Sequence, residues 1–65
     1  MKMTNYEIRV RGKDCHEWTE TCKSRAEARA RCAEWNGRFK LLRSSNPERA
    51  NAYRYANAII LGEVE

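Results

Sequence analysis

Hydrophobic and polar residues alternate strictly at the start of the chain. In the run NYEIRVRG, Tyr6, Ile8 and Val10 share one parity, and charged residues fill the positions between them. A period of two is typical of a β-strand with one buried face. The run CHEWTETC follows after Gly12 and two polar residues, and its tryptophan and threonines favour a second strand. The pattern therefore predicts a β-hairpin over residues 5–22.

The length of the hairpin loop decides which side chains share a face. A two-residue turn at residues 12–13 would set Glu7 opposite Trp18, whereas a three-residue loop at residues 12–14 sets Ile8 opposite Trp18. A shift of one residue moves every side chain of a strand to the other face. We expect the three-residue loop, because it gathers the apolar residues of both strands on one face.

A helix is predicted over residues 24–37. Ser24 and Glu27 have the S-x-x-E spacing of a capping box, and Asn36-Gly37 is typical of a helix C-terminus. Its bulkier apolar stripe is Ala28, Cys32 and Trp35. A thinner stripe is Ala26, Ala30 and Ala33. The thin stripe would need the second helix or another copy of the chain against it, so a homodimer is one expectation. Arg31 follows Glu27 by four residues, which favours an ion pair between them.

The rest of the chain predicts a third strand and a second helix. Phe39 and Leu41 share a face in the run RFKLL at residues 38–42. Asn46 followed by Pro47 is typical of a helix start, and Gly62 would end that helix. A C-terminal strand over AIILGEV is the alternative. The fold expected for residues 1–65 is one compact α+β domain. Its order is β-β-α-β-α, with a three-stranded antiparallel sheet packed by one or two helices.

Composition narrows the class of protein. The chain has 65 residues, of which 42% are hydrophobic and 34% charged, and its longest apolar run is AIIL. A membrane span needs about 18 apolar residues or more, so no membrane partner is expected. The start of the chain enters the first strand pattern directly and has no apolar segment typical of a signal peptide. We therefore expect a cytoplasmic location.

The residues with reactive side chains do not form a recognisable catalytic or metal motif. Cys15, His16, Cys22 and Cys32 lack the close cysteine pair of common zinc sites. Three cysteines is an odd count, which favours free thiols over a disulfide framework. Alternation along a strand sends Cys15 and His16 to opposite faces, which disfavours a nucleophilic pair. No catalytic residue, metal or cofactor is expected.

Charge is the main functional signal. The formal net charge is +4, and nine basic residues against three acidic ones lie within residues 23–54. Such asymmetry indicates an anionic partner. Tyr53 and Tyr55 would point in different directions from a helix, and Tyr55 is the one expected to be exposed as an anchor. The predicted partner-binding residues are Arg25, Arg29, Arg38, Lys40, Arg43, Arg49, Arg54 and Tyr55.

Two resemblances add to this interpretation. The run YEIRVRGKDCHEWTETCKSRAEARARCAEW resembles the hairpin and helix of the arm-type DNA-binding domains of tyrosine recombinases, and this likeness implies contact with DNA. In its size and charge the chain also resembles small phage-encoded proteins that modulate their hosts, anti-CRISPR proteins among them. That likeness implies stoichiometric binding through a rigid surface.

The sequence therefore predicts a non-catalytic binding protein. The leading hypothesis is a protein of the phage or mobile-element type that inhibits or remodels a host complex through protein–protein contact. Its basic face would meet an acidic surface of that complex. The alternative hypothesis is a small nucleic-acid-binding regulator, or a recombination accessory protein, that uses the same basic face.

Overall fold

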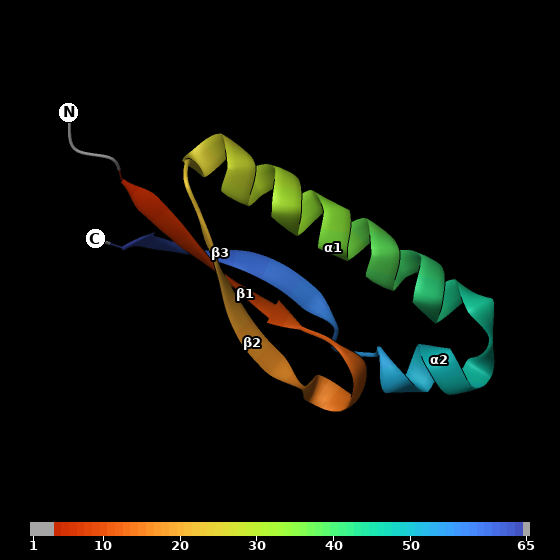
Figure 1. Ribbon diagram of the computed structural model, residues 1–65. Coiled ribbons are helices and arrows are strands. Elements are labelled where there is room, and N and C mark those ends of the chain that lie inside the picture. Colours follow the sequence, from red (N-terminus) through yellow and green to blue (C-terminus); the bar gives the residue numbers. More distant parts are fainter. Residues whose placement is uncertain (1–3, 65) are drawn as a thin grey trace.

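The computed structural model describes residues 4–64 as a sheet covered on one face by a long helix (Figure 1). The elements are, in chain order, β1 (Asn5–Arg11), the short 3-10 helix η1 (Lys13–Cys15), β2 (Glu17–Cys22), α1 (Arg25–Ser45), α2 (Pro47–Ala52) and β3 (Asn57–Val64). The sheet is antiparallel with the strand order β2-β1-β3, so β1 is central. The α+β class and the three-stranded antiparallel sheet are confirmed, and the order is β-β-α-α-β.

The hairpin has the expected faces but a longer loop. Val10 lies opposite Trp18, and Ile8 lies opposite Glu20, so the register differs by two residues from the one expected. A shift of two keeps the parity, and Trp18 stays on the same face as Ile8 and Val10. The loop closes through a hydrogen bond of 2.7 Å from the Gly12 N–H to the carbonyl of His16.

The helix that begins after Ser24 does not end at Gly37. The Ser24 hydroxyl accepts a hydrogen bond from the Glu27 N–H at 3.1 Å, as the capping box predicts. The helix then continues to Ser45, so the predicted third strand at residues 38–42 is wrong. The reason is the apolar spacing of four and three residues, which extends through Phe39 and Leu42. Burying Phe39 contributes about 2–3 kcal/mol, whereas Gly37 inside a helix costs about 1 kcal/mol.

The third strand lies at the C-terminal end of the described chain. Asn46 caps α2 as expected, since its Oδ1 accepts from the Arg49 N–H at 2.8 Å. However, α2 ends at Ala52, and the residues predicted to continue it form β3, as in the alternative interpretation. Ala58 and Ile60 face Val10 and Ile8 across the sheet. A strand at this place covers the second edge of β1. Its alternation turns Ala58 and Ile60 toward the core, whereas Ile59 and Leu61 lie on the other face and are exposed.

The core lies between the sheet and α1. Ile8, Val10 and Ala28 are fully buried, and the other members of the buried cluster come from β2, α1 and the stretch from Ala56 to Ala58. The opposite face of the sheet carries no helix (Figure 1). The Ala26, Ala30 and Ala33 stripe lies opposite the buried stripe of α1, and all three residues are exposed. Thus α2 does not cover the thin stripe. None of the helices within residues 4–64 has the length and apolarity to cross a membrane.

Candidate binding groove

Two adjoining cavities lie between η1, α1 and α2 and share Lys13, Leu42 and Tyr53. Their volumes are about 430 and 330 Å³. Together they are called the binding groove. Its polar and charged lining is Lys13, His16, Arg38, Asn46, Glu48 and Arg49. Its aromatic and apolar lining includes Trp18, Trp35, Phe39, Leu42 and Tyr53.

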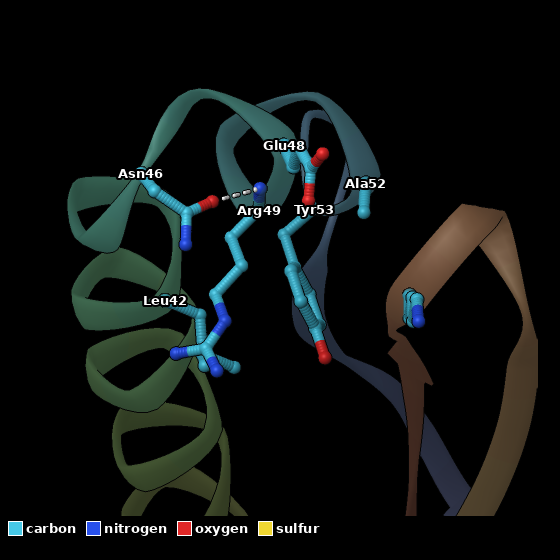
Figure 2. Close-up of a pocket in the computed structure, with 7 residues that line it drawn as sticks. Leu42, Asn46, Glu48, Arg49, Ala52 and Tyr53 are labelled. Carbon is cyan, nitrogen blue, oxygen red and sulfur yellow. Dashed lines mark hydrogen bonds between the residues drawn. The ribbon is translucent and has the colours of Figure 1, made fainter.

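Figure 2 shows the end of the groove nearest α2. Arg49 and Tyr53 extend in the same direction from this part of the chain, beside Leu42 of α1. The Asn46 cap fixes the start of α2, and the Tyr53 N–H bonds to the Arg49 carbonyl at 2.9 Å. These contacts hold the backbone of Arg49 and Tyr53, so both side chains extend from one wall.

The η1 turn supplies the opposite wall. Asp14 and Cys15 have positive φ angles of 54° and 64°. For residues other than glycine this conformation costs about 1–2 kcal/mol each, so the surrounding structure has to hold it. The His16 N–H bonds to the Lys13 carbonyl at 3.1 Å. This tight turn presents Lys13 and His16 toward the groove.

A row of aromatic rings forms the floor. His16, Trp18, Trp35, Phe39 and Tyr53 follow one another, with ring centroids separated in turn by 5.8, 5.4, 5.6 and 6.0 Å. The rings come from the η1 turn, β2, α1 and the end of α2, so the row connects every element around the groove. Aromatic pairs at these distances add about 0.5–1.5 kcal/mol each beyond the burial of their area.

Glu20 accepts hydrogen bonds from both tryptophans and fixes their orientation. Its carboxylate accepts hydrogen bonds from Trp18 Nε1 at 3.1 Å, Trp35 Nε1 at 3.3 Å and Arg31 Nη2 at 2.9 Å. Burial by itself would raise the pKa of Glu20, but the hydrogen bonds from Trp18, Arg31 and Trp35 outweigh it and hold this pKa below its usual range. Glu20 therefore stays ionised near neutral pH and holds both indoles in place.

Three cations line the groove without a carboxylate partner. Arg38 lies over the Trp35 ring, with its guanidinium carbon 5.1 Å from the ring centroid. Lys13 and Arg49 lie on the walls. Among residues 4–64, no carboxylate comes within 4.0 Å of the charged nitrogens of these three side chains. Glu48 is the acidic residue in the lining. The groove is therefore electropositive and aromatic.

The eight residues predicted to bind a partner do not form one face. A helix turns by about 100° per residue, which places Arg25, Arg29 and Lys40 on the side of α1 nearer β3. Arg38 lies on the side nearer β2. The contacts agree, because Asn36 bonds to Ala58 of β3 and Arg31 bonds to Glu20 of β2. Of the eight, the structure brings Arg38 and Arg49 to the groove.

Two predicted basic residues have structural partners. Arg43 Nη1 donates to the Ala56 carbonyl at 3.1 Å and to the Tyr53 carbonyl at 3.4 Å, so this side chain holds the turn before β3. Arg54 lies over the Tyr55 ring at 5.4 Å. Tyr55 is 58% exposed, as expected, and Tyr53 packs against Phe39.

Arg31 is paired, but not with Glu27. Its guanidinium contacts Glu20 at 2.9 Å and Glu34 at 3.3 Å. Arg31 pairs with Glu20 in preference to Glu27 because Glu20 is half-buried, so water screens its charge less than that of the exposed Glu27. Sequence reasoning missed Glu20 as well as Lys13. A signal for Glu20 was present, since its parity sets a carboxylate on the apolar face between Trp18 and Cys22.

The cysteines are free thiols. Cys22 and Cys32 are buried, and burial raises the pKa of both thiols, which makes them poor nucleophiles. Cys15 is exposed in the η1 turn. Within residues 4–64, no three side chains of the His, Cys, Asp and Glu types gather as a metal ion would require.

The chain was compared with protein families, curated proteins and solved structures. No protein family, no curated protein and no solved structure matches this chain.

Proposed function

We propose that this protein is a non-catalytic binding module that holds an acidic segment of a partner protein in the binding groove. The observation that supports this proposal is the combination of an aromatic floor with three unpaired cations, Lys13, Arg38 and Arg49. A bound segment would place carboxylates against the cations and one apolar side chain against the rings. Aromatic and arginine residues are the types that most often dominate binding energy at protein interfaces.

The mode of action that fits such a site is stoichiometric contact. In this proposal the partner is a host protein or complex with an acidic surface in the cytoplasm, which the module inhibits or remodels as small phage-encoded proteins do. The η1 turn and the Asn46 cap hold the walls of the groove, and the hydrogen bonds that Glu20 accepts from Trp18, Trp35 and Arg31 (the Glu20 cluster) hold its floor. Little conformational freedom of these parts would therefore be lost on binding. A preformed site of this kind gains affinity because fewer side chains have to be immobilised.

Nucleic acid is the second candidate partner, and a different surface favours it. Arg25, Arg29 and Lys40 form a row on the side of α1 nearer β3, and all three are exposed. Over the 15 residues from Arg25 to Lys40 a helix rises about 22 Å, so the row could follow several backbone phosphates. Arginine and lysine at such spacing neutralise phosphates and release counterions. This surface is called the α1 row.

Two matched triple variants separate the candidates. K13E/R38E/R49E reverses the groove cations, and R25E/R29E/K40E makes the same change of charge on the α1 row. Each variant is titrated with two probes, a set of Asp- and Glu-rich peptides that contain one aromatic residue, and a single-stranded oligonucleotide. The proposal predicts that the peptides bind the wild type and the α1-row variant, and that the groove variant binds at least tenfold more weakly.

Other outcomes decide against it. Loss of oligonucleotide binding in the α1-row variant, with no peptide bound by the wild type, would favour the nucleic-acid candidate. Equal loss of peptide affinity in both variants would mean that net charge alone attracts the peptides. A pull-down from lysate with and without nuclease then identifies the natural partner class, because a protein partner should survive the nuclease.

A further inference from the structure

The two edges of the sheet differ in whether another strand can pair with them. At the outer edge of β3, the Asn36 side chain accepts from the Ala58 N–H at 2.8 Å and donates to the Ala58 carbonyl at 3.1 Å. A register shift between Glu7 and Ile8 interrupts the β1–β3 ladder, and Gly62 nearby has a φ of 142°. Occupied backbone groups and bulges protect edges against pairing. The β3 edge is therefore protected at Ala58 and by the irregularity near Gly62.

The outer edge of β2 has neither kind of protection. The Gly12 N–H bonds to the His16 carbonyl, and antiparallel pairs alternate along a ladder, so Val10–Trp18 and Ile8–Glu20 are the hydrogen-bonded pairs. The N–H and C=O groups of Glu17, Thr19 and Thr21 consequently point away from β1. These residues are exposed, and within residues 4–64 no strand lies beside them and no side chain bonds to their backbone.

We infer that this protein forms a two-fold symmetric dimer in which the β2 edges of two copies pair as antiparallel strands, giving one six-stranded sheet. Only residues whose backbone groups point outward can form hydrogen-bonded pairs across the interface. A two-fold axis at Thr19 uses all three outward residues, because Thr19 pairs with Thr19 of the second copy and Glu17 pairs with Thr21. This register sets Trp18 opposite Glu20. The two neighbouring registers each leave Glu17 or Thr21 without a partner in β2. One of them would also set Glu20 opposite Glu20, which places two half-buried carboxylates together and is unfavourable.

The charges on α1 favour a second copy at the β2 edge and disfavour one at the β3 edge. On the side of α1 nearer β3, Arg25, Arg29 and Lys40 have the same sign, so two copies would repel there. On the side nearer β2 the charges alternate. A two-fold axis then sets Glu27 toward Arg38 of the second copy, and Arg31 toward Glu34. These two charge pairs are symmetric about residues 32–33 of α1. That part of the helix lies close to β2, since Arg31 and Trp35 both donate hydrogen bonds to Glu20.

A pair of variants at the axis tests the dimer by sedimentation equilibrium. Thr19→Pro removes the outward N–H and is compatible with the folded monomer, because proline is tolerated on edge strands when its nitrogen faces solvent. Thr19→Ala keeps the N–H and is the matched control. We expect the wild type and T19A to have twice the 7.7 kDa chain mass, and T19P to have the chain mass with an unchanged far-UV spectrum. A wild type at 7.7 kDa at millimolar concentration would overturn the inference, as would a T19P dimer.

Charge exchange tests the same two-fold without touching the strand. Each homodimer of E27R or of R38E has two like-charge contacts across the axis, whereas a heterodimer of the two variants has two opposite-charge contacts. We expect each variant alone to dissociate at least tenfold more readily than the wild type, and an equimolar mixture to recover dimers. If the mixture dissociates as readily as the separate variants, the proposed two-fold arrangement is wrong.

Discussion

The Asn36 side chain and the Ala58 backbone form a two-way hydrogen-bonded pair between α1 and β3. Oδ1 of Asn36 accepts from the Ala58 N–H at 2.8 Å, and Nδ2 donates to the Ala58 carbonyl at 3.1 Å. The amide thus takes the place of a neighbouring strand. It holds the C-terminal strand to the helix and satisfies the backbone groups at a sheet edge.

Replacing Asn36 with alanine should destabilise the protein. The variant loses two hydrogen bonds and leaves the Ala58 groups to water, for an expected loss of about 1–2 kcal/mol in the free energy of unfolding. Urea denaturation followed by tryptophan emission measures this loss. The control is Ser45→Ala, because the Ser45 hydroxyl donates to the Leu41 carbonyl within an exposed part of α1, a bond that joins α1 to no other element. An N36A variant as stable as S45A would contradict the role given to the amide.

Phe39 and Leu41 should differ strongly in their contribution to stability. Phe39 is 2% exposed and packs between Trp35 and Tyr53, whereas Leu41 is 74% exposed. Phe39→Ala should cost about 3–5 kcal/mol, which is a large fraction of the stability of a domain of this length. Leu41→Ala should change stability by less than about 0.5 kcal/mol. Thermal melts of the two variants measure the difference. Similar losses would support the strand predicted at residues 38–42, in which both side chains share a face.

The sequence predicted the first half of the chain better than the second. Strict alternation around Ile8 and the Ser24 capping box are local signals, and the first strand and the start of the helix form where these signals predict. Asn36-Gly37 gave a misleading local signal. The amide of Asn36 is used by β3, which is distant in the sequence, and the apolar stripe continues through Phe39 and Leu42 with helical spacing. A stripe followed across Gly37 would have predicted the longer helix.

The groove could be predicted only in part. Arg38 and Arg49 were expected to bind a partner, but they line one groove only because its two cavities adjoin at Lys13, Leu42 and Tyr53. Lys13 was not expected in the site. Its position depends on the left-handed backbone at Asp14 and Cys15, and neither residue is a glycine, the residue type that would have indicated such a conformation. Arg43 is the opposite case, because it was expected to bind a partner but has a structural role. It donates to two carbonyls in the turn before β3, and the sequence does not show that this turn lies beside it.

The two glycines at residues 12 and 37 should respond oppositely to alanine. A Cβ at Gly12 would lie 3.0 Å from Cζ3 of Trp18, in a packed ring that cannot easily move. Gly12→Ala should therefore cost about 1–3 kcal/mol and alter the near-UV spectrum of Trp18. A Cβ at Gly37 meets nothing within 4 Å, and alanine favours the helix, so Gly37→Ala should stabilise by about 0.5–1 kcal/mol. Urea melts test both. A stabilised G12A would contradict the packing of Trp18 described above.

The Glu20 cluster should make stability depend on pH. The pKa of Glu20 is lowered in the folded protein, so its contribution is present above the unfolded pKa of about 4.3 and is lost as pH falls through the folded value. Glu20→Gln removes the charge that Arg31 contacts and should cost about 1–2 kcal/mol at pH 7. The difference between wild type and E20Q should shrink as the pH falls below about 4. A gap that stays constant down to pH 2 would exclude this role for the carboxylate.

Intrinsic tryptophan fluorescence gives the most direct test of the binding groove. The chain has two tryptophans, and both Trp18 and Trp35 line the groove, so an occupant there has to change their environment. We predict that an acidic peptide with one aromatic residue shifts or quenches the emission saturably, that added salt weakens the effect, and that K13E/R38E/R49E abolishes it while R25E/R29E/K40E does not. An emission that stays constant when peptide binding is detected by another method would contradict the account.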